Sequence, residues 1–209
     1  NFESELHQLA LNYPNFYPVF VEGVLNVASD YRNIEEYISE LLLFRSHPQM
    51  IGLKDTVLKH FPNVEDFETE VSRVIEHYNE YFPLEPIQEV VTFVSEFGNK
   101  AIVYDGGVGI GLDMFLGQSY PYYSSLNIPS YVTNYLEPNL IVSNVARVLA
   151  EDFVPPAQGA VTMLDKIIEE GKKLYFAEFL VPKTPNHELI EFSEEQYQWC
   201  EENVFNIWS

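Results

Sequence analysis

The sequence contains few of the residues on which several common functions depend. Cys200 is the only cysteine among 209 residues, so no internal disulfide is possible. A cysteine nucleophile needs a histidine or another activating group, and none lies near Cys200 in the sequence. No run of about 18 apolar residues is present, so no segment is expected to span a membrane. We therefore interpret Cys200 as a small buried apolar residue of a helix.

Positively charged residues are also scarce. The chain carries 11 Lys and Arg against 32 Asp and Glu, which gives a formal net charge of −21. Such a charge repels nucleic acid and anionic lipid headgroups, so we predict no nucleic-acid partner. The acidity can also serve only to keep the protein soluble in its compartment, and this simpler interpretation stays open.

Histidine is missing from a segment that otherwise has the pattern of a zinc peptidase. A helix predicted over about 138–152 is followed by a second helix that contains the sequence EEGK at 169–172. In HExxH peptidases two histidines one helical turn apart bind zinc, and a following helix supplies the third ligand. Here no histidine lies between His77 and His187. The pattern therefore predicts a fold but argues against the chemistry.

The five motif positions fall on the segment from Arg147 to Glu151. Eighteen residues then separate Glu151 from Glu170, the spacing between the second histidine and the glutamate ligand in one large class of zinc peptidases. In this register Arg147 and Glu151 occupy the histidine positions, and Val148 occupies that of the general base. A cation cannot coordinate zinc, valine cannot accept a proton, and Glu170 alone cannot hold the metal. We predict a vestigial site without a metal or another cofactor.

The second helix also has a simpler interpretation. About one residue in seven is acidic, so a glutamate often falls at a chosen spacing. The helix would then present a solvated charged face, formed by Glu169, Glu170, Lys172 and Lys173. Its apolar face would pack inward, through Leu164, Ile167, Ile168, Gly171, Leu174 and Tyr175.

No internal repeat, charge block or Gly/Ser linker divides the chain, so we predict one domain over 1–209. Residues 1–87 and 131–209 have helical patterns. Between them we expect a small sheet at 88–117 and an irregular aromatic loop at 118–130. The predicted fold class is α+β and predominantly helical, a zincin-like metallopeptidase scaffold without an intact HExxH motif.

The predicted sheet consists of three segments, at 89–97, 100–104 and 108–117, which we interpret as a meander. Its glycines match neither a dinucleotide-binding nor a P-loop motif, because no helix cap or Lys-Ser/Thr pair follows them. We expect the glycines to permit turns, a bulge, or the close approach of another backbone.

Two helices have clear signals of their own. Ser193 and Gln196 match a capping box, which predicts a helix that continues to Trp208. The other helix follows Asn63 and has an apolar stripe at helical spacing. This stripe consists of Phe67, Val71, Val74, Ile75 and Tyr78.

Short strings over most of the chain carry a family pattern. They are GIGLDMFLG at 109–117, YP at 120–121, MLD at 163–165, GKKLYF at 171–176, LVP at 180–182 and SEEQ at 193–196, followed by Trp199, Glu202-Asn203 and Ile207-Trp208. In this order and separation they resemble GldB, the gliding-motility-associated lipoprotein family.

The resemblance implies a lipid-anchored protein of the bacterial cell envelope, tied to gliding motility or to a related role. It also implies a relationship to zincin-like peptidases whose HExxH motif has decayed. The expected partners are envelope proteins of the gliding or secretion machinery. The family anchor is an N-terminal lipobox cysteine, which is expected to precede Asn1, because the chain starts without Met and Cys200 lies near the other end.

We therefore predict a non-catalytic domain that acts by protein–protein interaction. The candidate partner surface is the aromatic segment with Tyr120, Tyr122 and Tyr123, since exposed aromatic residues often anchor interfaces. These tyrosines can also pack on the domain itself. Two other functions stay open: a hydrolase or metallopeptidase with an unrecognised site, and a small-ligand binding module with an aromatic pocket.

Overall fold

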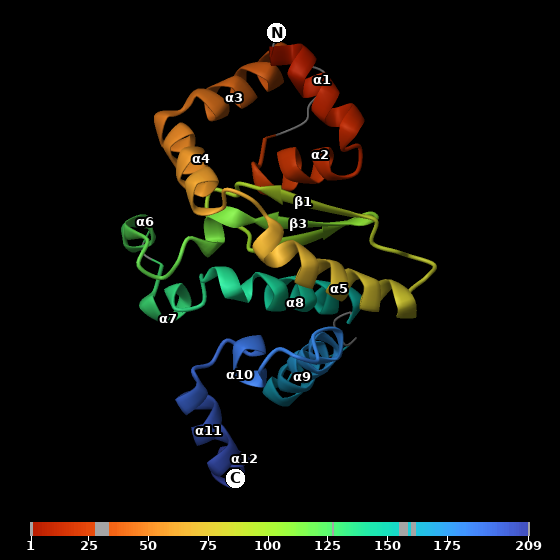
Figure 1. Cartoon of the computed structure of the whole chain (residues 1–209), viewed down its shortest axis with the longest axis vertical. Helices are drawn as coiled ribbons and strands as arrows, with labels where there is room; N and C mark the ends of the chain where they lie inside the picture. The colour runs from red at the N-terminus through yellow and green to blue at the C-terminus, as the bar shows by residue number, and fades with distance from the viewer. Residues whose placement is uncertain (1, 28–33, 127, 155–158, 160–161, 209) are drawn as a thin grey trace.

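The computed structural model describes residues 2–27, 34–126, 128–154, 159 and 162–208. The elements are arranged along the long axis of the molecule, as Figure 1 shows. Helices α1–α4 lie at one end, and a small sheet follows with α5 and α8 beside it. Helices α9–α12 lie at the other end. This is the predicted α+β, predominantly helical architecture.

The N-terminal part is helical, as predicted. Its elements are α1 (Phe2–Asn12), α2 (Phe16–Pro18), the π-helix η1 (Val19–Val24), α3 (Ile34–Ser46), α4 (Pro48–His60) and α5 (Glu65–Tyr81). Helix α5 buries four residues of its predicted stripe, while Ile75 is half-buried. By contrast, α1 buries no residue and α3 buries only Leu41. The first helices therefore contribute little to the core.

The sheet contains β1 (Glu89–Phe93), β2 (Ala101–Tyr104) and β3 (Gly107–Gly111) in the order β1-β3-β2. Strand β3 pairs in parallel with β1 and antiparallel with β2. The predicted meander is therefore wrong, because β3 lies in the centre. Its Val108 and Ile110 are fully buried, which suits a central strand better than an edge.

The first and third strands along the chain, β1 and β3, are shorter than the segments predicted for them. Strand β1 ends at Phe93, because the carboxylate of Asp113 accepts hydrogen bonds from the backbone N–H groups of Ser95 (2.8 Å) and Phe97 (2.6 Å). These bonds turn the chain out of the sheet, and Glu96 and Phe97 adopt positive φ angles of 53° and 65°. After β3 the chain forms the 3₁₀ turn η3 (Leu112–Phe115) instead of continuing as a strand.

The second half of the chain consists of helices and turns. They are α6 (Pro121–Ser125), α7 (Ser130–Thr133), the 3₁₀ turn η4 (Pro138–Leu140), α8 (Ile141–Phe153), α9 (Met163–Leu180), α10 (Asn186–Leu189), α11 (Glu194–Glu202) and α12 (Val204–Trp208). Helix α6 lies in the segment that was expected to be irregular. Ser193 and Gln196 form the predicted capping box. The expected single helix to Trp208 is interrupted at Asn203, whose side chain donates to the carbonyl of Trp199 (2.8 Å).

The buried apolar residues form two clusters on the two faces of the sheet. The main cluster joins β3 to helices α5, α8 and α9 and contains Val108, Ile110 and Leu149. The smaller cluster lies against α2 and η1 and contains Phe16, Phe93 and Tyr104. Because the second cluster is small, α2 and η1 are held to the sheet by few buried side chains.

Candidate functional site

The predicted vestigial positions lie on α8 and α9, which pack against each other. The guanidinium of Arg147 on α8 lies 3.4 Å from the carboxylate of Glu191, which follows α10. The same carboxylate accepts a hydrogen bond from Lys100, which precedes β2. Glu191 is therefore shared by two cations and links α8 to the edge of the sheet. Arg147 is thus one half of an internal ion pair.

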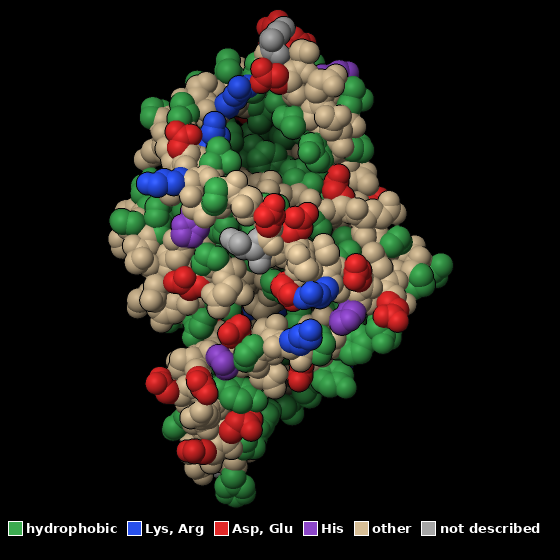
Figure 2. Space-filling model, viewed as in Figure 1, with side chains coloured by type: hydrophobic (Ala, Val, Ile, Leu, Met, Phe, Trp, Pro, Cys, Tyr) green, Lys and Arg blue, Asp and Glu red, His purple; other side chains and the backbone are tan. Residues whose placement is uncertain are grey.

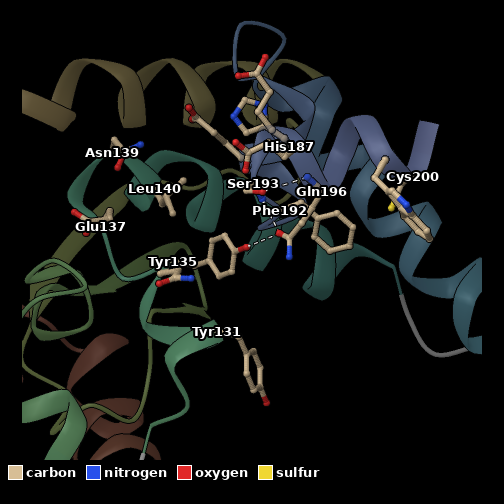
Figure 3. A pocket seen from close by; sticks show the side chains of 15 residues that line it. Tyr131, Tyr135, Glu137, Asn139, Leu140, His187, Phe192, Ser193, Gln196 and Cys200 are labelled. Carbon is tan, nitrogen blue, oxygen red and sulfur yellow. Dashed lines mark hydrogen bonds between the residues drawn. The ribbon is translucent and has the colours of Figure 1, made fainter. Parts of the chain in front are cut away.

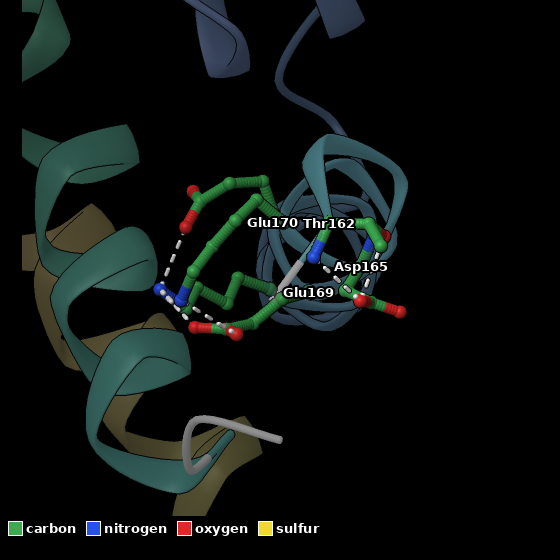
Figure 4. Close-up of polar contacts among 6 residues, drawn as sticks. Thr162, Asp165, Glu169 and Glu170 are labelled. Atoms are coloured by element: carbon green, nitrogen blue, oxygen red, sulfur yellow. Dashed lines mark hydrogen bonds and ion pairs between the residues drawn. The ribbon is translucent and has the colours of Figure 1, made fainter. Parts of the chain in front are cut away.

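Glu170, one of the predicted positions, and its neighbour Glu169 are held near a lysine. The ammonium of Lys173 lies 2.7 Å from the exposed Glu170 carboxylate and 3.8 Å from that of Glu169, whose side chain is only 7% exposed. Figure 4 shows these contacts around the start of α9. The hydrogen bond to Glu170 raises the pKa of Lys173, and the charges of Glu170, Glu151 and Glu169 act in the same direction, while burial opposes them. The structure therefore brings Glu151 and Glu170 toward one internal cation.

The chemistry available between α8 and α9 follows from these neighbours. Val148, at the general-base position, is half-buried against the main core and cannot accept a proton. Within the described ranges no group of three or more His, Cys, Asp or Glu side chains is arranged to hold a metal ion. The carboxylates of Glu169 and Glu170 are paired with Lys173 of the same helix. These pairs link residues one turn apart on α9.

The alternative interpretation of α9 is wrong about its faces. Residues expected to pack inward are exposed, among them Leu164, Ile167, Ile168 and Tyr175. Glu169, expected on a solvated face, is buried, together with Ala177 and Leu180. The buried face of α9 is narrow, and Lys166 (3.4 Å) and Lys173 provide the opposite charges that a buried carboxylate requires.

The tyrosines of the predicted partner surface differ in their environments. Tyr123 is fully buried, where its hydroxyl donates to the carbonyl of Asp113 (2.8 Å) and accepts from the N–H of Leu116 (3.1 Å). This residue is part of the core, so its assignment to a contact surface is wrong. Tyr120 is half-buried, whereas Tyr122 is 37% exposed. Of the three, Tyr122 and the edge of Tyr120 are available to a partner.

Tyr120 and Tyr122 lie beside Phe97, which sequence analysis did not assign to this surface. The ring of Phe97 is 6.2 Å from the ring of Tyr120 and 5.6 Å from that of Tyr122. Together with Leu126 and residues of α4 they line a shallow cleft of about 510 Å³. The positive φ of Phe97, fixed by Asp113, turns its ring toward this cleft. We call the exposed parts of Phe97, Tyr120, Tyr122 and Leu126 the aromatic surface.

A larger and more polar cleft of about 990 Å³ lies between α7, η4 and the C-terminal helices (Figure 3). It contains His187 and Cys200, which lie in different parts of the lining. The hydroxyl of Ser193 is used as a helix cap, and Tyr135 donates to Gln196 (3.3 Å). The Ser193 hydroxyl is therefore already engaged in a helix cap, and Cys200 is only partly buried.

An apolar hollow of about 800 Å³ lies between the N-terminal helices and strand β1. Figure 2 shows it as a recess lined with hydrophobic side chains, with basic side chains along one side of its rim. Its lining includes six aromatic rings from α1, the segment 13–20 and α3. They are Phe2, Tyr13, Phe16, Tyr17, Phe20 and Phe44, joined by Phe93 on the sheet.

These elements define a mainly helical α+β domain with an internally paired polar site and several hollows of the size that ligands and peptides occupy. The family model described as "Gliding motility protein GldB" matches residues 1–209, and the chain belongs to this family. Its family is that of gliding-motility-associated, membrane-anchored envelope lipoproteins. No curated protein and no solved structure matches the chain. In the described part of the chain, no helix combines the length and apolarity needed to cross a bilayer.

Sequence reasoning missed both the apolar hollow and Phe97. The density of aromatic residues before residue 25 was a usable signal for the hollow. Its far wall comes from α4 and β1, which lie tens of residues away in sequence, and only the fold brings them together. For Phe97 the signal was misleading, because its aromatic and β-branched surroundings predicted a strand.

Proposed function

We propose that this chain is a non-catalytic domain of the gliding-motility envelope machinery that binds a protein partner through its aromatic surface. The observation that carries the non-catalytic part is the ion pairing of the charged residues on α8 and α9 with other residues of the chain. Lys173 contacts Glu169 and Glu170, and Arg147 contacts Glu191. Carboxylates that are neutralised in this way are poor ligands for a second cation.

The degenerate zinc-peptidase origin remains part of this proposal. Its support is the order of the elements, in which α8 carries the former motif positions and α9 carries Glu170. Replacement of a ligand by Arg147 and of a base by Val148 removes both the metal site and the proton acceptor. A scaffold that has lost its reaction can keep its surface for recognition.

The interaction part rests on the aromatic surface. Phe97 and Tyr122 form a tilted pair with one partly exposed edge, and the buried hydroxyl of Tyr123 anchors the segment beneath them. Rigid aromatic side chains lose little conformational entropy on binding and are common at the energetic centres of interfaces. The surface is therefore suited to a protein partner.

The test is capture of envelope proteins by the purified domain with Tyr122→Ala. We expect this variant to fold normally and to lose most of the specific capture, because interface aromatic residues contribute about 2 kcal/mol or more. Tyr131→Ala is the matched control, since Tyr131 is 70% exposed and lies outside the aromatic surface. Tyr123 is not included, because its loss would disturb the core.

Two results would contradict the proposal. Unchanged capture by Tyr122→Ala would remove the aromatic surface as the binding site. Stoichiometric zinc in the purified protein, together with turnover of a general peptide substrate, would replace the non-catalytic interpretation by a hydrolase with an unrecognised site.

A further inference from the structure

The apolar hollow has a composition that departs from the rest of the molecule. The chain has 32 acidic residues and only 11 Lys and Arg, yet the described residues that line the hollow include no Asp or Glu. The charged residues in this described lining are Arg45 at the end of α3 and Lys54 on α4. A hollow in so acidic a protein that is apolar inside and carries Lys54 at its rim is complementary to an anionic amphiphile.

The hollow is also too large to be a packing defect. Protein cores are close-packed, with few voids larger than a water molecule, whereas this space measures about 800 Å³. Apolar side chains of its lining remain exposed, including Leu9 (46%) and Ile51 (47%). Burial of such surface by an apolar ligand releases about 25 cal/mol per Å². The N-terminal helices thus enclose an apolar space that their own side chains do not fill.

The two basic residues differ in whether they already contact other side chains of the protein. Arg45 donates to Glu5, and its guanidinium lies 5.2 Å from the ring centroid of Phe2. Lys54 is exposed, and within the described ranges it makes no ion pair. Lys54 is therefore the charge that is free to receive an anionic group at the rim, whereas the charge of Arg45 is compensated by Glu5.

We propose that the hollow binds a single alkyl chain with a carboxylate head, with the chain among the aromatic rings and the head at Lys54. This inference is independent of the aromatic surface and adds a ligand site to the protein. The occupant enters as a monomer, because the net charge of −21 repels an anionic membrane surface. Phe16 and Phe93 form the floor of the site, since they lie 5.6 Å apart between η1 and the sheet.

The first experiment measures displacement of a fluorescent fatty acid by saturated monocarboxylates from octanoate to myristate, below their aggregation concentrations. Each added methylene is expected to raise the affinity about fourfold until the hollow is filled, which corresponds to about 0.8 kcal/mol per buried methylene. A flat dependence on chain length, or the absence of saturable displacement, would overturn the proposal.

Two pairs of variants test the position of the ligand. Leu9→Trp fills the hollow from a half-exposed position and should abolish binding, whereas Leu43→Trp, on the exposed side of α3, should not. Lys54→Ala should weaken carboxylate binding about two- to fivefold, as expected for an exposed ion pair, and leave a fatty alcohol unaffected. Lys59→Ala on the same helix is its charge-matched control. Circular dichroism establishes that each variant is folded, and equal binding by Leu9→Trp and the unmodified protein would refute the site.

A vesicle experiment separates the two sources of an alkyl chain. We expect no co-flotation of the protein with phosphatidylglycerol vesicles under conditions in which monomeric laurate binds. Binding to the vesicles without binding to laurate would contradict the proposal, because the ligand would then be a membrane surface. Displacement of the fluorescent fatty acid by an apolar peptide but not by laurate would assign the hollow to a protein segment. This result would also contradict the proposal.

Discussion

At the scale of single residues, Asp113 connects the sheet to the aromatic surface. Its carboxylate is fully buried and accepts hydrogen bonds from three donors, the N–H and hydroxyl of Ser95 and the N–H of Phe97. Burial raises the pKa of Asp113, while these hydrogen bonds lower it, and burial is the larger effect. Asp113, from the turn after β3, therefore sets the conformation of Phe97.

The raised pKa of Asp113 predicts the sign of a pH effect. A carboxyl whose folded pKa lies above its unfolded value of 3.8 favours folding when it is protonated. Its contribution is complete below pH 3.8 and is lost as the pH rises through the folded pKa. The free energy of unfolding of the unmodified protein, minus that of Asp113→Asn, should therefore fall over this window. Denaturant titrations at a series of pH values measure the difference, and an increase with pH would contradict the assignment.

The residue scale also shows what the sequence could and could not predict about the candidate site. Counting could place Arg147, Val148, Glu151 and Glu170 on two helices, because helical spacing is fixed by backbone geometry, and their origin as metal-site positions stays a prediction. The burial of Glu169 could not be predicted from the sequence, since it depends on the rotation of α9 about its axis where it packs against α8. Tyr123 was misassigned for a similar reason, because a buried and an exposed tyrosine look identical in a sequence.

At the scale of elements, β3 is defined by its glycines. A Cβ atom at Gly111 would lie 2.0 Å from the backbone oxygen of Asn99, and one at Gly109 would lie 2.8 Å from Ile102 and Phe93 side-chain atoms. The expected close approach of another backbone is thus confirmed at Gly111. The alternate residues Val108 and Ile110 point to the main core. One strand therefore serves two layers with opposite requirements for space.

Substitution of these glycines tests this division. Gly111→Ala should destabilise the protein by about 1–3 kcal/mol, because the backbone of Asn99 must move. Gly171→Ala in α9 meets no atom within 4 Å and should stabilise by about 0.5–1 kcal/mol, so it is the matched control. Thermal or urea unfolding gives both values. Equal effects of the two substitutions would show that space at Gly111 is not limiting.

The elements themselves were predicted better than their arrangement. Periodicity and caps gave the helices α5, α8 and α11, because these signals are local. The strand order was wrong because hydrogen-bond pairing is not local, and a tight turn at 105–106 explains only the β2–β3 hairpin. The lengths of β1 and β3 were overestimated, since the hydrogen bonds of Asp113 compete with the ladder at Ser95.

At the scale of the whole molecule, the net charge of −21 is the dominant property. Like charges spread over a compact surface repel each other, and unfolding separates them. Salt screens this repulsion, because the Debye length falls from about 30 Å at 0.01 M to about 10 Å at 0.1 M ionic strength. The stability of this protein should therefore depend on salt.

We expect the melting temperature to rise by several degrees between 10 mM and 0.1 M ionic strength, the range over which the Debye length falls about threefold. Equal ionic strengths of sodium chloride and potassium chloride should give the same increase, because screening does not depend on the identity of the cation. Differential scanning calorimetry provides the measurement. A melting temperature that falls with salt would mean that internal ion pairs, such as that of Arg147 and Glu191, outweigh the overall repulsion.

The central position of β3 has a consequence for folding during synthesis on the ribosome. Strands β1 and β2 are synthesised first, but each is paired only with β3. Until β3 leaves the exit tunnel, both earlier strands lack their hydrogen-bonding neighbour and expose apolar residues to chaperones. The nascent sheet then closes in a single step, so a translational pause shortly before Gly107 would prolong the most aggregation-prone interval of synthesis.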